Sequence, residues 1–221
     1  MNKISTLRAW RTCILLLLLL LGMISIALGS LQLSEISQGN AQGSYSTMPL
    51  PVVVHIVFGI IFNLLSPFQF APSIRTNYPK FHRYSGRLLV VSAIPVVFSA
   101  LWMNQYFPSY GGTLKYTGII AYCIVLLGSL FLAIKYVMRK DIQNHRLWMM
   151  RAMAAALGPA TQRLIIIPVV VIFGEEVVTD RVIGLLIWSG ILINLAFVEY
   201  LRFRERGLSH QDPRVKFFQR T

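Results

Sequence analysis

The stretch HRLWMMRAMAAALGPATQRLIIIPVVVIF, residues 145–173, carries the two features on which the fold prediction depends. It begins with basic, aromatic and Met residues and continues as an apolar run long enough to cross a membrane, which takes about 20 helical residues. One charge, Arg163, lies inside that run, about 18 Å beyond Arg151 at ~1.5 Å per helical residue. An intramembrane cation costs several kcal/mol unless it faces protein, water or an anion. The stretch therefore predicts a transmembrane helix that turns a cation toward the interior of a helix bundle.

Composition places the whole chain in a membrane. Of its 221 residues, 55% are hydrophobic and 13% are charged, and the mean hydropathy is +0.61. The charged share is about half that of a soluble globular protein. The net charge of +13 is divided among clusters between apolar runs, which fits contact with anionic lipid headgroups at the cytoplasmic face and excludes a nucleic-acid-binding patch.

The apolar runs predict an all-α, polytopic transmembrane helical bundle with six spans. These spans are expected at about 12–29, 50–66, 86–104, 114–137, 145–173 and 182–200. The expected organisation is a cytoplasmic N-terminus at 1–11, a first span or signal anchor at 12–29, an external loop at 30–49, a five-span bundle at 50–201 and a basic cytoplasmic tail at 202–221. Cleavage after the small residues Ala27 and Gly29 is the alternative to a retained first span.

The distribution of basic residues predicts the orientation. The segments 1–11, 72–87, 135–151 and 202–221 hold 3, 4, 5 and 6 of the 21 Lys and Arg residues. They alternate with links that are poor in positive charge. Since cytoplasmic loops carry the excess of Lys and Arg, both termini are predicted to be cytoplasmic.

Two similar motifs precede the third and fifth spans: HRYSGR at 82–87 and HRLWMMR at 145–151. Imidazoles on neighbouring helices can ligate a b-type haem, so His82 and His145 are candidate haem ligands. The arginines of the two motifs could pair with haem propionates or bind another anion; they are Arg83, Arg87, Arg146 and Arg151. The alternative is that both motifs only meet lipid phosphates.

A third histidine, His55, is expected about 8 Å below the outer end of its span, and Arg163 about 15 Å below the outer end of the fifth. Both are predicted to face the bundle interior, with Asn63 and Gln162 as polar neighbours. His55 is then a third candidate haem ligand and Arg163 a candidate ligand-binding residue. The alternative for His55 is a hydrogen-bonded core residue.

Small residues in the fifth span predict a central, closely packed helix. They are Ala152, Ala154, Ala155, Ala156 and Gly158. Pro159 follows them and leaves the carbonyl of Ala155 without its helical donor. The two cysteines, Cys13 and Cys123, belong to no metal-binding motif, and no Ser or Cys lies near a His and a carboxylate at a spacing typical of hydrolases.

The residues discussed above, in combination, resemble a family of bacterial predicted membrane proteins, domain of unknown function 2306. The resemblance covers roughly residues 50–170. It rests on His55, Pro67-Phe68-Gln69-Phe70, His82-Arg83 with Gly86-Arg87, Asp141 with His145-Arg146, Trp148-Met149 with Arg151, and Arg163. It implies a polytopic membrane protein and supplies no reaction. The expected location is the bacterial inner membrane.

The sequence thus predicts an integral membrane protein of unassigned activity, with enzymatic activity left open. One hypothesis is a membrane redox protein that binds haem b within its bundle. A second is non-redox binding or transport of an anionic lipid or small molecule, with Arg163 as the central residue. A third is a structural subunit with a membrane-protein partner.

Overall fold

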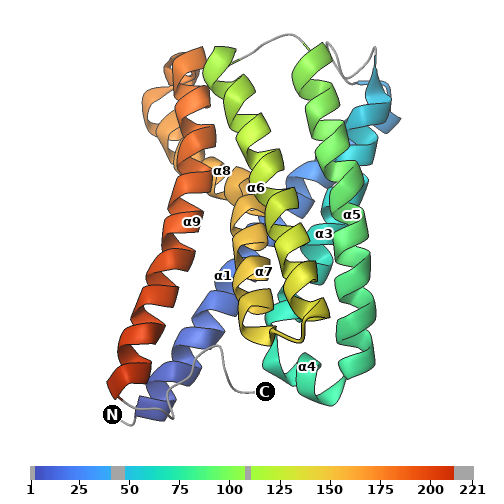
Figure 1. Ribbon diagram of the computed structural model, residues 1–221. Helices are drawn as coiled ribbons and strands as arrows, with labels where there is room; N and C mark the ends of the chain where they lie inside the picture. Colours follow the sequence, from blue (N-terminus) through green and yellow to red (C-terminus); the bar gives the residue numbers. More distant parts are fainter. Residues whose placement is uncertain (1–2, 41–47, 108–110, 212–221) are drawn as a thin grey trace.

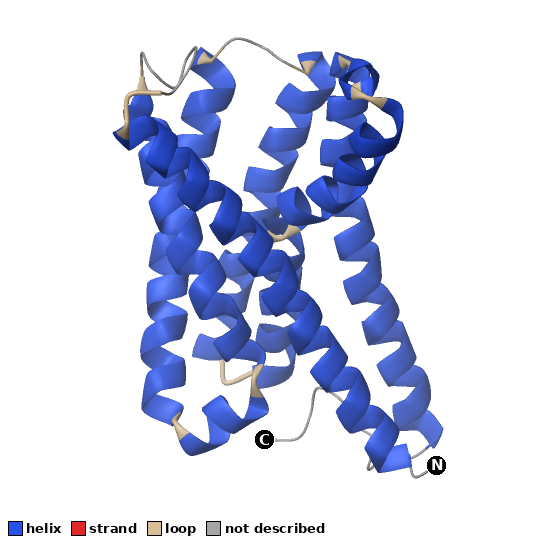
Figure 2. Ribbon diagram, turned by 180° about the vertical axis from the view of Figure 1, so that it is seen from behind, coloured by secondary structure: helices blue, strands red, loops and turns tan. Residues whose placement is uncertain are grey.

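The computed structural model describes residues 3–40, 48–107 and 111–211, and this part of the chain is helical apart from short links (Figures 1 and 2). The helices are α1 (Lys3–Ser37), α3 (Pro49–Phe70), α4 (Pro72–Asn77), α5 (Pro79–Tyr106), α6 (Gly112–Met138), α7 (Ile142–Ala156), α8 (Gly158–Phe173), the 3₁₀ turn η1 (Glu175–Val177) and α9 (Asp180–Gln211). Six segments are long and apolar enough to cross a membrane, with α7 and α8 together forming one of them. The predicted all-α bundle of six spans is confirmed.

The chain connections gather at two opposite ends of the bundle. The start of α1, the end of α9, α4 and the turn between α6 and α7 lie at one end (Figure 1). The starts of α3, α6 and α9 lie at the other. Successive connections therefore alternate between the two ends, as the charge distribution predicts. Which end faces the cytoplasm stays a prediction. Tail residues 212–221, which hold three of the tail's basic residues, lie outside the described part.

Two segments expected to be loops are partly helical. Helix α1 continues through Ser37, so residues 30–37 extend the first span instead of opening an external loop. This segment is polar but has no Pro or Gly after Ser30, and the helix ends just before Gly39, which has φ +73°. The expected basic loop at 72–85 contains α4 and the first turns of α5, which both begin with Pro at a position where Pro favours helix initiation.

The turn between α6 and α7 is fixed by an N-cap. Lys140 adopts a left-handed backbone conformation with φ 60°, and Asp141 follows it as the cap of α7. The Asp141 carboxylate accepts hydrogen bonds from the Asn144 backbone N–H at 3.0 Å and from the Asn144 side-chain amide at 2.7 Å. Hydrogen bonds from the Asn144 side chain and backbone hold the pKa of Asp141 below its usual value, which favours the charged capping form.

The predicted fifth span is broken at Leu157, where α7 ends and α8 begins. Pro159 has no N–H to continue the ladder of backbone hydrogen bonds. Asn194 of α9 bridges the break, because its side-chain amide donates to the Ala154 carbonyl at 3.0 Å and its side-chain oxygen accepts from the Thr161 hydroxyl at 2.9 Å. A polar residue of α9 therefore stabilises both halves of the broken span.

Small side chains lie in the core beside larger apolar ones, and the fifth span contributes several of them, as the sequence predicts. Helix α3 packs on α5, and α7 packs on α6. Ala93, Ala133, Ala152, Ala155 and Ala160 are each at most 1% exposed. Such small residues allow helix backbones to approach closely where lipid supplies no hydrophobic drive for association.

Gly158 marks the tightest of these contacts. A Cβ at this position would overlap the phenol oxygen of Tyr122 on α6. A Cβ on Gly190 of α9 would approach the Gly158 carbonyl and the same phenol. The absence of side chains here lets α6, α8 and α9 meet at the helix break.

Labelling at introduced cysteines tests the predicted orientation. In a chain with Cys13→Ser and Cys123→Ala, we expect Glu175→Cys to react with an impermeant maleimide in sealed right-side-out vesicles. Lys140→Cys should react only after detergent opens the vesicles, because its turn carries the positive charge of a cytoplasmic loop. Labelling of Lys140→Cys before permeabilisation would show that the orientation is the opposite of the predicted one.

Gly158→Ala should destabilise the protein by about 1–3 kcal/mol, the usual cost of forcing extra atoms into a packed core. The matched control is Gly128→Ala on α6, where an added Cβ meets nothing within 4 Å. Thermal unfolding in detergent measures the difference. Adding Tyr122→Phe to Gly158→Ala removes the overlapped oxygen and should restore part of the lost stability. An unchanged Tm for Gly158→Ala alone would contradict the close packing at this position.

Asn194→Leu should lower the stability by about 1 kcal/mol, the scale of interhelical hydrogen bonds in membranes. For a protein of this size that corresponds to a Tm decrease of about 2–4 °C. Asn77→Leu is the control, since Asn77 is exposed at the end of α4. Equal effects of the two substitutions would show that Asn194 does not stabilise the break.

Candidate functional site

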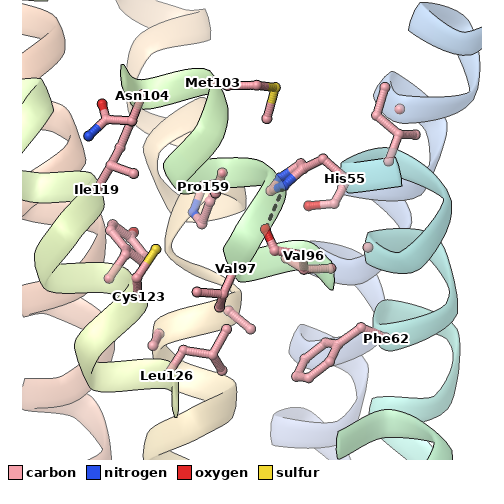
Figure 3. A pocket seen from close by; sticks show the side chains of 18 of the residues that line it. His55, Phe62, Val96, Val97, Met103, Asn104, Ile119, Cys123, Leu126 and Pro159 are labelled. Atoms are coloured by element: carbon pink, nitrogen blue, oxygen red, sulfur yellow. Dashed lines mark hydrogen bonds between the residues drawn. The ribbon is translucent and has the colours of Figure 1, made fainter. Parts of the chain in front are cut away.

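A cavity of about 420 Å³ lies inside the bundle (Figure 3). Its walls come from α1, α3, α5, α6 and the α7–α8 break, with one residue from α9. It extends from residues near the end of α5, such as Asn104, to Pro159 at the break. The break in the fifth span therefore forms part of a cavity wall within the membrane-spanning region.

Two cations and several neutral polar side chains line this cavity. The cations are Lys115 and Arg163. The neutral polar groups include Gln32, His55, Asn63, Asn104, Tyr122 and Gln162. None of the described lining residues is Asp or Glu. Asp180, outside the lining, interacts electrostatically with Lys115, whereas no described carboxylate does so with Arg163.

Arg163 lies on α8, about 15 Å along the helix from Phe173. Its side chain is half-buried. Within the described ranges, its guanidinium makes neither a hydrogen bond nor an ion pair. The two ion pairs of the described side chains both involve Glu199, which pairs with Arg151 and Arg202. The cation in the fifth span thus faces a cavity without a protein counter-ion.

His55 is held at the cavity by a bond to α5. Its Nδ1 atom lies 3.0 Å from the Val96 carbonyl oxygen and 3.2 Å from the Ser99 hydroxyl (Figure 3). A carbonyl can only accept, so Nδ1 carries the proton and donates. In the neutral ring Nε2 is then the unprotonated nitrogen, and it is available as an acceptor or a ligand.

Two further polar atoms near the cavity are buried without a hydrogen-bond partner among the described residues: Asn63 Oδ1 and Tyr122 OH. The Asn63 amide donates to the Gly59 carbonyl of its own helix at 2.9 Å, which leaves its oxygen unused. Buried polar groups without partners are uncommon and are often found at functional sites. Both residues line the cavity.

The structure thus brings His55, Asn63, Gln162 and Arg163 around one cavity, as the helical positions predict. Gln32 and Lys115 were not foreseen as site residues. Gln32 was missed because it fell in the expected external loop. Lys115 had one sequence signal, because it is one of three basic residues outside the four basic segments.

His82 and His145 lie elsewhere, in the first turns of α5 and α7 at the end of the bundle that contains α4. His145 Nδ1 donates to the Ala133 carbonyl of α6 at 2.9 Å. This bond joins α7 to α6, as expected of a structural histidine. The structure therefore separates His55 from the other two candidate haem ligands, while His82 and His145 lie near enough to each other to interact electrostatically.

The predicted anion-binding arginines at this end make contacts within the protein. Arg151 bonds to the Glu199 carboxylate at 2.6 and 2.7 Å and lies over the Trp148 ring at 4.2 Å. Arg83 donates to the Pro79 carbonyl of its own helix at 3.2 Å, and Arg87 lies 5.8 Å from the Tyr84 ring. Arg146 also has an interaction of its own. Their ligand role stays a prediction.

A haem with two axial histidines needs both imidazoles at one cavity. The large cavity is lined by His55 but by neither His82 nor His145. No group of three or more His, Cys, Asp or Glu suited to a metal ion occurs among the described residues. His55 thus has no second candidate histidine at this cavity, and His82 and His145 lie near each other outside it. Haem b stays a prediction from the sequence.

Comparisons with known proteins agree with this architecture. Neither a curated protein nor a solved structure matches the chain. A family model described as a predicted membrane protein, DUF2306, matches residues 52–202. The match runs from the first turn of α3 into α9 and so includes every helix of the cavity except α1. The chain belongs to the DUF2306 family of predicted membrane proteins, as its motifs indicate.

Proposed function

We propose that this integral membrane protein binds a small organic anion in the cavity at the α7–α8 break, with Arg163 as the main anion-binding residue. The observation that carries the proposal is the guanidinium itself. It lies within a membrane span, lines a cavity and has no protein partner among the described residues.

The electrostatic cost supports an anionic ligand. Burying a cation away from water costs several kcal/mol unless an opposite charge compensates it. Lys115 adds a second positive charge to the same cavity, and the described walls supply no carboxylate. Asp180, which lies outside the cavity lining, interacts electrostatically with Lys115, so Arg163 is the cation that a bound anion would compensate. The planar guanidinium can bind an oxyanion through two parallel hydrogen bonds.

The cavity volume indicates the size of the ligand. About 420 Å³ lies within the range of 300–1,000 Å³ typical of small-molecule sites. Such a site fits a metabolite or a single acyl chain better than a complete phospholipid. The cavity therefore favours a small organic anion over the anionic lipid that the sequence also allowed.

Transport of that anion is a second candidate, favoured by the break between α7 and α8. Broken helices near the bilayer midplane form the substrate sites of many transporters. A binder holds its anion, whereas a transporter exchanges it across the membrane. Counterflow of a labelled anion into liposomes that contain the protein would separate the two.

Thermal unfolding in a nonionic detergent tests anion binding. The probes are benzoate, decanoate and phenyl phosphate, each compared with an uncharged counterpart: benzamide, decanol and phenol. At a concentration 100 times its Kd, a bound anion should stabilise the protein by about 2.7 kcal/mol and raise the Tm by several degrees. The neutral counterparts should have little effect.

Arg163→Leu should abolish this increase in Tm, because the substitution removes the binding charge and leaves an apolar side chain that is compatible with a membrane span. The matched control is Arg181→Leu, which removes an exposed cation near the start of α9 and should respond to anions as the wild type does. The proposal would be overturned if anions raised the Tm of Arg163→Leu as much as that of the wild type, or if no anion raised the Tm of the wild type.

A further inference from the structure

We infer that the ligand is an amphiphilic organic acid that carries a hydrogen-bond donor next to its anionic group, a hydroxylated carboxylic acid being the simplest example. This inference rests on the proposed anion-binding function of the cavity and adds the role of His55. Arg163 would bind the oxyanion, and His55 Nε2 would accept a hydrogen bond from the neighbouring hydroxyl.

The first support is the state of the His55 ring. The bond from Nδ1 to the Val96 carbonyl at 3.0 Å requires the proton on Nδ1. It also fixes the orientation of the ring, which lies against the cavity in Figure 3. A neutral His55 therefore offers the cavity an acceptor, Nε2, whereas Arg163 can only donate.

The second support is that the His55 ring and the Arg163 guanidinium belong to the same cavity. His55 and Arg163 line the same cavity and are near enough to interact electrostatically. An acid without a donor would satisfy the guanidinium and leave Nε2 without a partner. A site with a fixed acceptor discriminates strongly against analogues that lack the matching donor, since the unpaired buried group is costly.

The third support is the distribution of polarity along the cavity. Figure 3 places Phe62, Val97 and Leu126 at one end of the cavity, away from Asn104 at the other. These three side chains are at most 7% exposed. An apolar chain would bury its surface among them while its head group lies with His55 and Arg163. The cavity thus suits an acid with an apolar body better than a compact hydrophilic anion.

Binding of 3-hydroxydecanoate and decanoate to the purified full-length protein tests this inference. The two acids have the same charge and almost the same apolar body, so the difference in their Kd values reports the hydroxyl. We expect the wild type to bind 3-hydroxydecanoate at least tenfold more tightly. Equal Kd values for the two acids would overturn the inference.

His55→Asn is the informative variant, because the Asn amide nitrogen can occupy the position of Nδ1 and still donate to Val96 while the Nε2 acceptor is removed. We expect the ratio of its Kd values for decanoate and 3-hydroxydecanoate to fall to about one. A preference that persists in His55→Asn would overturn the role of His55.

The outcome also separates this inference from the proposed function. If both acids bind the wild type equally and Arg163→Leu binds neither, the anion site stands and the hydroxyl contact is wrong. If neither acid binds although benzoate or phenyl phosphate does, the amphiphilic ligand is wrong and the anion site again stands. If no anion of either set binds, both proposals fail.

Discussion

The structure depends on one electrostatic constraint, the placement of a guanidinium inside the hydrocarbon layer. Arg163 lies far enough from either end of its span that it cannot reach bulk water by extending along the helix. The chain must therefore give it an internal polar environment. The cavity at the α7–α8 break is that environment, and neutral polar side chains such as His55, Asn63 and Gln162 line it without compensating the charge.

The cavity exists because the fifth span does not continue as a single helix. Pro159 prevents a regular backbone ladder, and the chain restarts as α8 after Leu157. Asn194 satisfies groups on both sides of the break, and Gly158 lets α6 and α9 approach it closely. The break is thus closely packed against α6 and α9 at Gly158, and it borders the cavity at Pro159.

The sequence predicted the features that follow from hydropathy and helical spacing. Six spans and the shared cavity of His55 and Arg163 belong to this group. It did not predict the helical extension that carries Gln32, because polar residues end a hydrophobic run without ending a helix. It also did not predict that Asn194 would bridge the break, since a partner in another span depends on tertiary packing that one sequence does not encode locally.

The contrast between the two ends of the bundle argues that ligand binding belongs in the cavity. At the end with α4, two of the candidate residues already serve the fold: His145 joins two helices through Ala133, and Arg151 is paired with Glu199. A ligand there would compete with existing bonds. In the cavity, Arg163 has no partner among the described residues and His55 keeps Nε2 available, so a ligand would gain interactions without breaking any. The same residue types are thus structural at one end and available for binding in the cavity.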